Sequence, residues 1–149
     1  LYTTSDDSFY IIDESTGKVA VRKPLAMKME VPSTPLVTGS EIIFGTGDQG
    51  LVALDSKTLD RKWQFKTGTS LVFTTPYTHQ PFATVATSPV LAGENVYFGA
   101  SDGCIYGVDR TTGKKVFCYD TGAPVFSSPA ISTGTMVICD FGGNVYMFN

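Results

Sequence analysis

The chain has 149 residues, of which 42% are hydrophobic and 17% charged, and its net charge is −3 at pH 7. This composition excludes a disordered chain, and the length suits one domain with a sizeable core. The 11 Lys and Arg residues are scattered, so we expect no nucleic-acid partner, and no apolar run approaches the roughly 20 residues that a transmembrane helix needs.

The residue usage favours strands joined by tight turns. Fifteen Gly, eight Pro, seven Tyr and ten Phe therefore predict an all-β chain. The first strand-like segment, LYTTSDDSFYIID, begins at Leu1 without a methionine. We expect a processed or excised piece of a longer protein.

One pattern then recurs without gaps along the chain. It reads FYIIDESTGKVAV at Phe9–Val21, LVALDSKTLDRKW at Leu51–Trp63 and IYGVDRTTGKKVF at Ile105–Phe117, and VYMFN at Val145–Asn149 starts a fourth copy. The aligned residues are Asp13, Asp55, Asp109 and Asn149, at intervals of 42, 54 and 40 residues. Repeats of about 40 residues, one with an insertion of about a dozen, are typical of four-stranded propeller blades.

Two further markers keep a fixed order before each of the later copies. A Ser-Pro type strand appears as STPLV, TSPVL and SSPAI, and a short apolar strand follows it as EIIFG, NVYFG and MVICD. The third copy thus contains the predicted strands ATSPVLA, NVYFGA, CIYGVD and KKVFCYD. In CIYGVD, Cys104, Tyr106 and Val108 share one face and Ile105 and Gly107 share the other, which fits a blade between neighbouring blades.

We therefore predict a β-propeller of four-stranded antiparallel blades, with about three and a half blades in this chain. The blades are a partial one at residues 1–25, a complete one at 26–66, one with an inserted loop at 67–120, and a partial one at 121–149. An open propeller exposes apolar blade faces and unpaired strand edges. We expect a protein partner, a missing propeller segment, or a homodimer that completes a seven-bladed ring.

The recurring aspartates have two interpretations. Asp109 before Thr112 and Gly113 resembles a phosphoryl acceptor, and Asp102 with Asp109 resembles a cation site. The alternative is a turn in which the carboxylate accepts hydrogen bonds from local amides. Recurrence favours the turn, because a catalytic aspartate is needed once and a blade turn in every blade.

The turn after each aspartate ends in Gly17 and Gly113, where a positive φ is easiest for glycine. Leu59 occupies the aligned position in the second copy, so we expect a different turn there. Eight residues after each aspartate stands an apolar residue that we expect to pack between adjacent blades, namely Val21, Trp63 and Phe117.

The three cysteines, Cys104, Cys118 and Cys139, contain no C-x-x-C pair, which argues against a disulfide framework and a zinc site. We expect each of the three cysteines to be a small buried apolar residue. A hairpin turning at residues 110–113 would place Cys104 and Cys118 nearly opposite each other, and an oxidising compartment could then join them.

The longest segment outside the repeat runs from Lys66 to Ala86. Loops held on a rigid scaffold often carry binding function, so a partner-binding loop would contain Tyr77, His79, Gln80 and Phe82. The alternative is an ordinary interblade loop. No G-x-S-x-G elbow or P-loop ending accompanies it, and we expect no catalytic and no metal-binding residues.

The aspartate, Thr-Gly and aromatic pattern, preceded by Ser-Pro and VYFGASDG, resembles the pyrroloquinoline-quinone (PQQ) type propeller repeat. That repeat occurs in quinoprotein dehydrogenases, in the lipoprotein scaffold of outer-membrane protein assembly, and at the C-terminus of calcineurin-like phosphoesterases. In the dehydrogenases the resemblance implies a quinone between a tryptophan and a vicinal disulfide, with a calcium ion and a catalytic aspartate nearby. This chain has no adjacent cysteines and one tryptophan, Trp63, so we expect no PQQ and no other cofactor.

The resemblance implies a non-catalytic scaffold or binding module of a larger periplasmic or extracellular bacterial protein. That parent protein would be a hydrolase if the module follows a metallophosphoesterase domain. The alternative function is a fragment of a quinone-dependent dehydrogenase.

Overall fold

The computed structural model describes residues 2–5, 8–27, 31–72 and 82–149, and every regular element in these ranges is a β-strand. The strands are β1 (Tyr2–Ser5), β2 (Ser8–Ile12), β3 (Val19–Pro24), β4 (Leu36–Val37), β5 (Glu41–Gly45), β6 (Leu51–Asp55), β7 (Arg61–Phe65), β8 (Val90–Ala92), β9 (Asn95–Gly99), β10 (Cys104–Asp109), β11 (Lys115–Asp120), β12 (Ala130–Ser132), β13 (Thr135–Cys139) and β14 (Val145–Phe148). The predicted all-β chain is confirmed.

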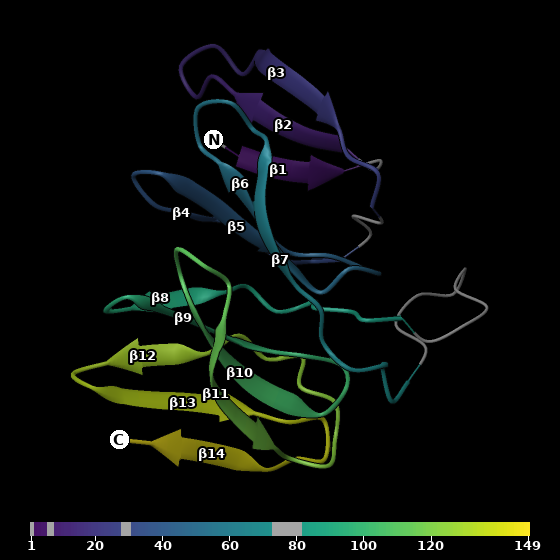
Figure 1. Cartoon of the computed structure of the whole chain (residues 1–149), viewed down its shortest axis with the longest axis vertical. Helices are drawn as coiled ribbons and strands as arrows, with labels where there is room; N and C mark the ends of the chain where they lie inside the picture. Colours follow the sequence, from purple (N-terminus) through teal and green to yellow (C-terminus); the bar gives the residue numbers. More distant parts are fainter. Residues whose placement is uncertain (1, 6–7, 28–30, 73–81) are drawn as a thin grey trace.

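Among the described residues these strands form four antiparallel sheets that follow one another along the chain (Figure 1). The first sheet has the order β1-β2-β3, the second β4-β5-β6-β7, the third β8-β9-β10-β11 and the fourth β12-β13-β14. Consecutive strands are neighbours, as in the blades of a propeller. The partial propeller of four-stranded blades is therefore confirmed, with three strands in its first and last sheets.

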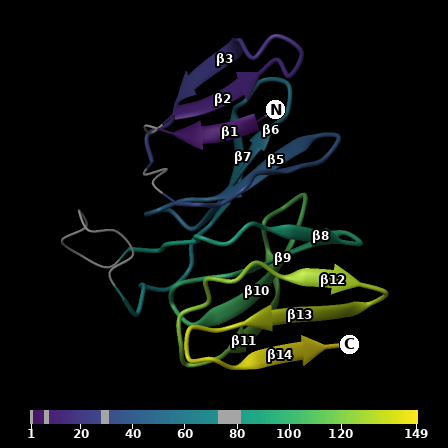
Figure 2. The same ribbon diagram turned by 180° about the vertical axis from the view of Figure 1, so that it is seen from behind.

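The up-and-down order separates the connections into two groups. The turns between the first and second and between the third and fourth strands of a blade lie at one end, which we call the turn end. The turns between β5 and β6, β9 and β10, and β13 and β14, together with the connections between sheets, lie at the other, which we call the loop end. Figure 2 shows the turns after β8 and β12 at the turn end, on the side opposite the connection from β7 to β8.

Alternating side chains of the middle strands fill the spaces between sheets. Ile42 and Phe44 of β5 pack in one cluster with Phe9 of the first sheet, whereas Ile43 packs in another with Phe98 of the third. A third cluster joins the third and fourth sheets. Because successive residues of a strand point to opposite faces, an apolar run such as EIIFG is needed to bury both.

The Ser-Pro markers form hydrogen bonds within their own sheet and with the marker of the neighbouring sheet. The hydroxyl oxygens of Ser33 and Ser127 accept the backbone N–H of Gly45 and Cys139, at 2.9 and 2.8 Å, and Thr87 does the same for Gly99. The next residue of each marker links neighbouring sheets, since Ser88 Oγ accepts from Thr34 N and Ser128 Oγ from Ser88 N, both at 2.9 Å. The marker therefore connects strands within a blade and joins neighbouring blades.

The turn that ends at Leu59 is the same as its glycine counterparts, so the expectation of a different turn was wrong. Leu59 has a φ of 59°, close to the 68° of Gly17 and Gly113. Its N–H donates to Asp55 O at 2.9 Å, as the two glycines do to their own aspartates. Leu59 tolerates this left-handed conformation because its side chain is buried against Met27 and Leu54.

Two of the three residues expected to pack between blades do so. Trp63 of β7 belongs to the cluster between the second and third sheets, and Phe117 of β11 packs against the cluster that joins the third and fourth. Val21 of β3 is 38% exposed, so this part of the prediction was wrong. Five of the six residues of β3, the outer strand of its sheet, are exposed.

Candidate functional site

The three aspartate turns lie at the turn end, and each carboxylate is occupied by its own turn. Asp109 Oδ1 accepts the N–H of Thr111 and Thr112 at 3.1 and 2.8 Å and the Thr112 hydroxyl at 2.7 Å. Asp13 and Asp55 accept equivalent amides two and three residues on. Each is therefore a local Asx turn, the structural interpretation of the motif.

These hydrogen bonds lower the pKa of all three carboxyl groups. For Asp109 the Thr112 hydroxyl contributes most, followed by the Thr112 amide, and for Asp55 the amides of Thr58 and Lys57 dominate. Hydrogen bonds to the charged form stabilise it. The carboxylates are thus held ionised, which suits a turn cap and opposes a role as proton donor.

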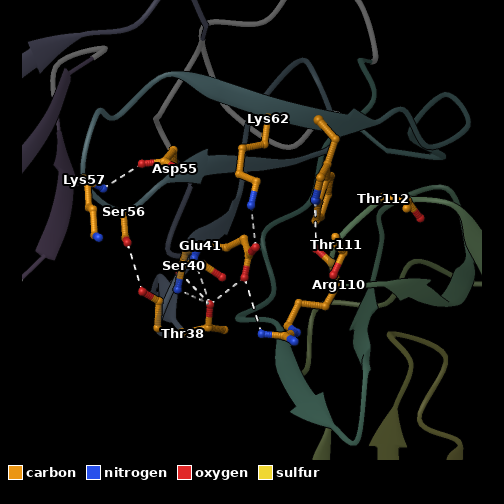
Figure 3. Close-up of polar contacts among 12 residues, drawn as sticks. Thr38, Ser40, Glu41, Asp55, Ser56, Lys57, Lys62, Arg110, Thr111 and Thr112 are labelled. Atoms are coloured by element: carbon orange, nitrogen blue, oxygen red, sulfur yellow. Dashed lines mark hydrogen bonds and ion pairs between the residues drawn. The ribbon is translucent and has the colours of Figure 1, made fainter.

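A charged network joins the second and third sheets near this end (Figure 3). Glu41 begins β5, and only 3% of its side chain is exposed. Its carboxylate accepts Lys62 Nζ at 2.6 Å and the Thr38 hydroxyl at 2.8 Å, and Arg110 Nη1 lies 3.5 Å away. Burial acts to raise the pKa of Glu41, but the hydrogen bonds from Lys62 and Thr38 outweigh it, and the pKa is lowered.

Arg110 ties this network to the third sheet. Its guanidinium pairs with Glu94 at 2.7 Å, and its carbonyl oxygen accepts the indole N–H of Trp63 at 2.9 Å. The network satisfies a buried carboxylate with partners from two blades. It is a structural link, and sequence reasoning missed it because its members are far apart in the chain.

The one tryptophan does not fit a quinone site. Trp63 is buried, and the Cα of Gly113 lies so close to its ring that a Cβ there would be 2.7 Å from the ring atoms. With its N–H bonded to Arg110, the indole is packed between two blades rather than presented to a planar cofactor. Within the described part of the chain, Trp63 therefore does not provide the stacking surface that a quinoprotein site needs.

The described residues that flank the predicted partner-binding loop lie at the loop end. Tyr77, His79 and Gln80 fall outside the described residues, which include Phe82. Phe82 is half-buried, and its carbonyl oxygen accepts the N–H of Ser70 at 2.9 Å. The described part of the loop is thus fastened to the chain that leaves β7.

Two large apolar side chains are exposed at this same end. Leu71 is 55% exposed and Phe141 is 73% exposed, and the Phe141 ring contacts Phe126 with centroids 5.7 Å apart. Backbone hydrogen bonds hold each segment in place, because Leu71 N donates to Ser101 O and Phe141 N to Pro124 O. We call Leu71, Phe126 and Phe141 the loop-end patch. Sequence reasoning missed it, although Phe141 stands in a turn that otherwise contains only Asp, Gly and Asn.

A small cavity of about 260 Å³ between the first two sheets and another of about 210 Å³ beside the last sheet are lined mainly by apolar side chains. Within the described residues no three His, Cys, Asp or Glu side chains are grouped as metal ligands. The same ranges contain no helix long and apolar enough to cross a membrane.

The three cysteines are unpaired thiols in the structure. The register of the β10–β11 hairpin pairs Cys104 with Asp120 and Tyr106 with Cys118. Cys104 and Cys118 are therefore diagonal neighbours on one face rather than directly opposite. Cys118 is exposed, so the expectation of three buried cysteines was wrong.

Comparison with known proteins gives one family and several distant relatives. The family described as "Outer membrane protein assembly factor BamB" matches residues 1–149. The chain is 27% identical to a tetrathionate hydrolase of Acidithiobacillus ferrooxidans over its whole length, which is 24% of that protein.

Solved structures share the fold. BamB from Moraxella catarrhalis superimposes with a TM-score of 0.74 at 20% identity, covering 97% of this chain and 41% of that one. A quinohemoprotein alcohol dehydrogenase from Pseudomonas putida HK5 gives a TM-score of 0.61 at 18% identity, covering 84% of this chain and 20% of the enzyme. The chain thus spans less than half of these proteins.

Proposed function

Because the chain belongs to the family described as outer membrane protein assembly factor BamB, we propose that it is a protein-binding propeller module without catalytic activity. The parent protein is a larger protein of the bacterial envelope, periplasmic or extracellular. The family and the similarity to the Moraxella catarrhalis BamB fold support this proposal.

The loop-end patch is the observation that carries the proposal. Leu71 and Phe141 expose large apolar side chains on segments that backbone hydrogen bonds hold to the sheets. Rigidly held aromatic and aliphatic side chains are the usual anchors of protein interfaces. We include the predicted loop residues Tyr77, His79, Gln80 and Phe82 in the proposed contact surface, because the described residues on either side of residues 73–81 lie at the same end.

The carboxylates support a module without catalytic activity. Asp13, Asp55 and Asp109 use their oxygens to cap turns, and Glu41 is enclosed by its own partners. A fragment of a quinone-dependent dehydrogenase is the alternative, favoured by the fold of the Pseudomonas putida enzyme alone. Titration with PQQ and calcium separates the two, since saturable binding that quenches Trp63 fluorescence would support the enzyme.

The two incomplete sheets offer a second kind of contact. Strands β3 and β7 are the last in the first two sheets, whereas the fourth sheet ends with its third strand, β14, which exposes Val145 and Met147. Another chain or a further propeller segment would cover this edge. A homodimer that kept all four described sheets would contain eight sheets rather than seven blades, and sedimentation velocity would detect it.

A photocrosslinking experiment tests the proposed surface. A photoreactive phenylalanine analogue replaces Phe141 or Leu71 in the parent protein, and in a matched control it replaces Thr112 at the turn end. We expect crosslinks to another envelope protein from the two loop-end positions and none from position 112. Equal crosslinking from both ends, or none at all, would refute the proposal. The sequence of the parent gene decides whether a metallophosphoesterase domain precedes the module.

A further inference from the structure

The β10–β11 hairpin places two thiols on one face of its sheet. Cys104 and Cys118 are diagonal neighbours across the ladder, and, after burial, Cys118 is one of the groups that raise the pKa of the Cys104 thiol. Fifteen residues, from Cys104 to Cys118, would be enclosed by a bond between them. Diagonal neighbours across an antiparallel ladder lie about 7–8 Å apart, so the two strands must move closer for a bond to form.

The surroundings differ for the two cysteines. Cys118 is exposed, whereas Cys104 is partly buried against the cluster between the second and third sheets. Strand β11 is the edge of its sheet, so it can move toward Cys104 without breaking a second ladder. Cys139 lies in β13, on the neighbouring sheet.

We propose that Cys104 and Cys118 are a redox-modification site, which forms a reversible disulfide within the hairpin by exchange with a disulfide-bearing oxidant. This inference goes beyond the proposed protein-binding function and does not depend on it. It agrees with an envelope location, because disulfides persist in oxidising compartments.

The reaction proceeds in two exchange steps. The exposed Cys118 thiol loses its proton, attacks one sulfur of the oxidant and forms a mixed disulfide, and the first oxidant thiolate leaves with that proton. Cys104 then loses its proton, attacks Cys118 Sγ and releases the second oxidant thiol. The two cysteines lose two electrons, and the oxidant disulfide gains them as two thiols.

The order of attack follows from accessibility. Burial raises the pKa of Cys104 to about 11, so this thiol is almost entirely protonated near neutral pH. Cys118 meets the oxidant from solvent, and Cys104 serves as the resolving thiol once the mixed disulfide holds the two sulfurs together.

The disulfide would fix the strand that covers the last sheet. Phe117 and Tyr119 flank Cys118 in β11, and each ring contacts Phe148 of β14 with centroids 5.4 Å apart. Tying β11 to β10 therefore also holds the contact between the third and fourth sheets.

Oxidised glutathione is the probe for the test, and intact-mass spectrometry under native conditions is the readout. We expect the unaltered chain and Cys139→Ser to lose two hydrogen atoms without retaining glutathione. We expect Cys104→Ser to retain one glutathione on Cys118, because the resolving thiol is missing, and Cys118→Ser to form no internal disulfide. Peptide mapping of Cys139→Ser without reduction locates the bond.

A second measurement follows stability. A loop of this length should raise the melting temperature by about 5–10 °C on oxidation, and a thiol reductant should reverse the change. Accumulation of the glutathione adduct in the unaltered chain, loss of closure in Cys139→Ser, or a disulfide that forms only in urea would each overturn the proposal.

Discussion

Removing the charge of Lys62 tests whether the Glu41 network holds the second and third sheets together. Lys62→Met keeps the aliphatic stem and removes the ammonium group that lies 2.6 Å from Glu41 Oε1. The carboxylate, which is almost fully buried, then keeps the Thr38 hydroxyl at 2.8 Å and the longer contact with Arg110 at 3.5 Å.

The expected loss follows from these contacts. Leaving a buried charge without its partner costs about 3–5 kcal/mol when nothing else compensates it. Thr38 and Arg110 still compensate Glu41 in part, and the Lys62 side chain is 30% exposed, so we expect a loss of about 2 kcal/mol in the free energy of unfolding.

Urea denaturation followed by Trp63 fluorescence measures this loss, because Trp63 is the only tryptophan and lies between the same two sheets. A double-mutant cycle with Glu41→Gln should give a coupling energy of about 1–2 kcal/mol. Asp60→Asn is the control, since the Lys23–Asp60 pair is also short, at 3.0 Å, but Asp60 is largely exposed. A loss below about 0.5 kcal/mol for Lys62→Met, the range of exposed ion pairs, would refute the reasoning.

Three other changes test the repeat architecture in the same unfolding assay. Leu59→Gly relieves the strain of the left-handed backbone but removes a buried side chain, and we expect the free energy of unfolding to fall by about 1 kcal/mol. A gain in stability would show that backbone strain outweighs the burial of the side chain. Ser88→Ala removes the acceptor of the Thr34 amide and should lower the free energy of unfolding by about 0.5–1 kcal/mol. An unchanged unfolding midpoint would show that this hydrogen bond between sheets does not stabilise the fold. Acidification should lower stability below about pH 4. Carboxyl groups such as Asp109 have a lower pKa in the folded state than in the unfolded state, so their contribution to stability is lost as the pH falls toward the pKa of the folded state. Stability that stayed constant down to pH 2 would contradict this assignment.

The sequence predicted the features that every blade repeats. The aspartate turn, the apolar middle strands and the aromatic residues Trp63 and Phe117 each follow from a local pattern, because hydrogen bonds within a turn and alternation along a strand need no distant partner. The Leu59 turn was misjudged for the opposite reason. Its left-handed conformation is maintained by contacts with Met27, which the local pattern does not contain.

The features that arise between blades could not be predicted from the sequence. The local pattern around Glu41 does not predict its burial, which depends on Lys62 and Arg110 from two different sheets. The diagonal arrangement of Cys104 and Cys118 depends on the register of the hairpin, which is set by the bulge at Gly107 and Val108. Strand register and the packing between blades are therefore the features that only the structure reveals.

Function in such a repeat protein is best sought where the repeat is broken. Residues that recur in several sheets, such as Asp55 and Ser88, have the same hydrogen-bonding role each time, and that role accounts for their presence. Phe141, Leu71 and Cys118 have no such repeated role, and each exposes an apolar or reactive side chain on a well-fastened segment. Replacing Phe141 with Ser should therefore leave the unfolding midpoint nearly unchanged while it weakens crosslinking at the loop end. A large loss of stability with unchanged crosslinking would assign Phe141 to the fold instead.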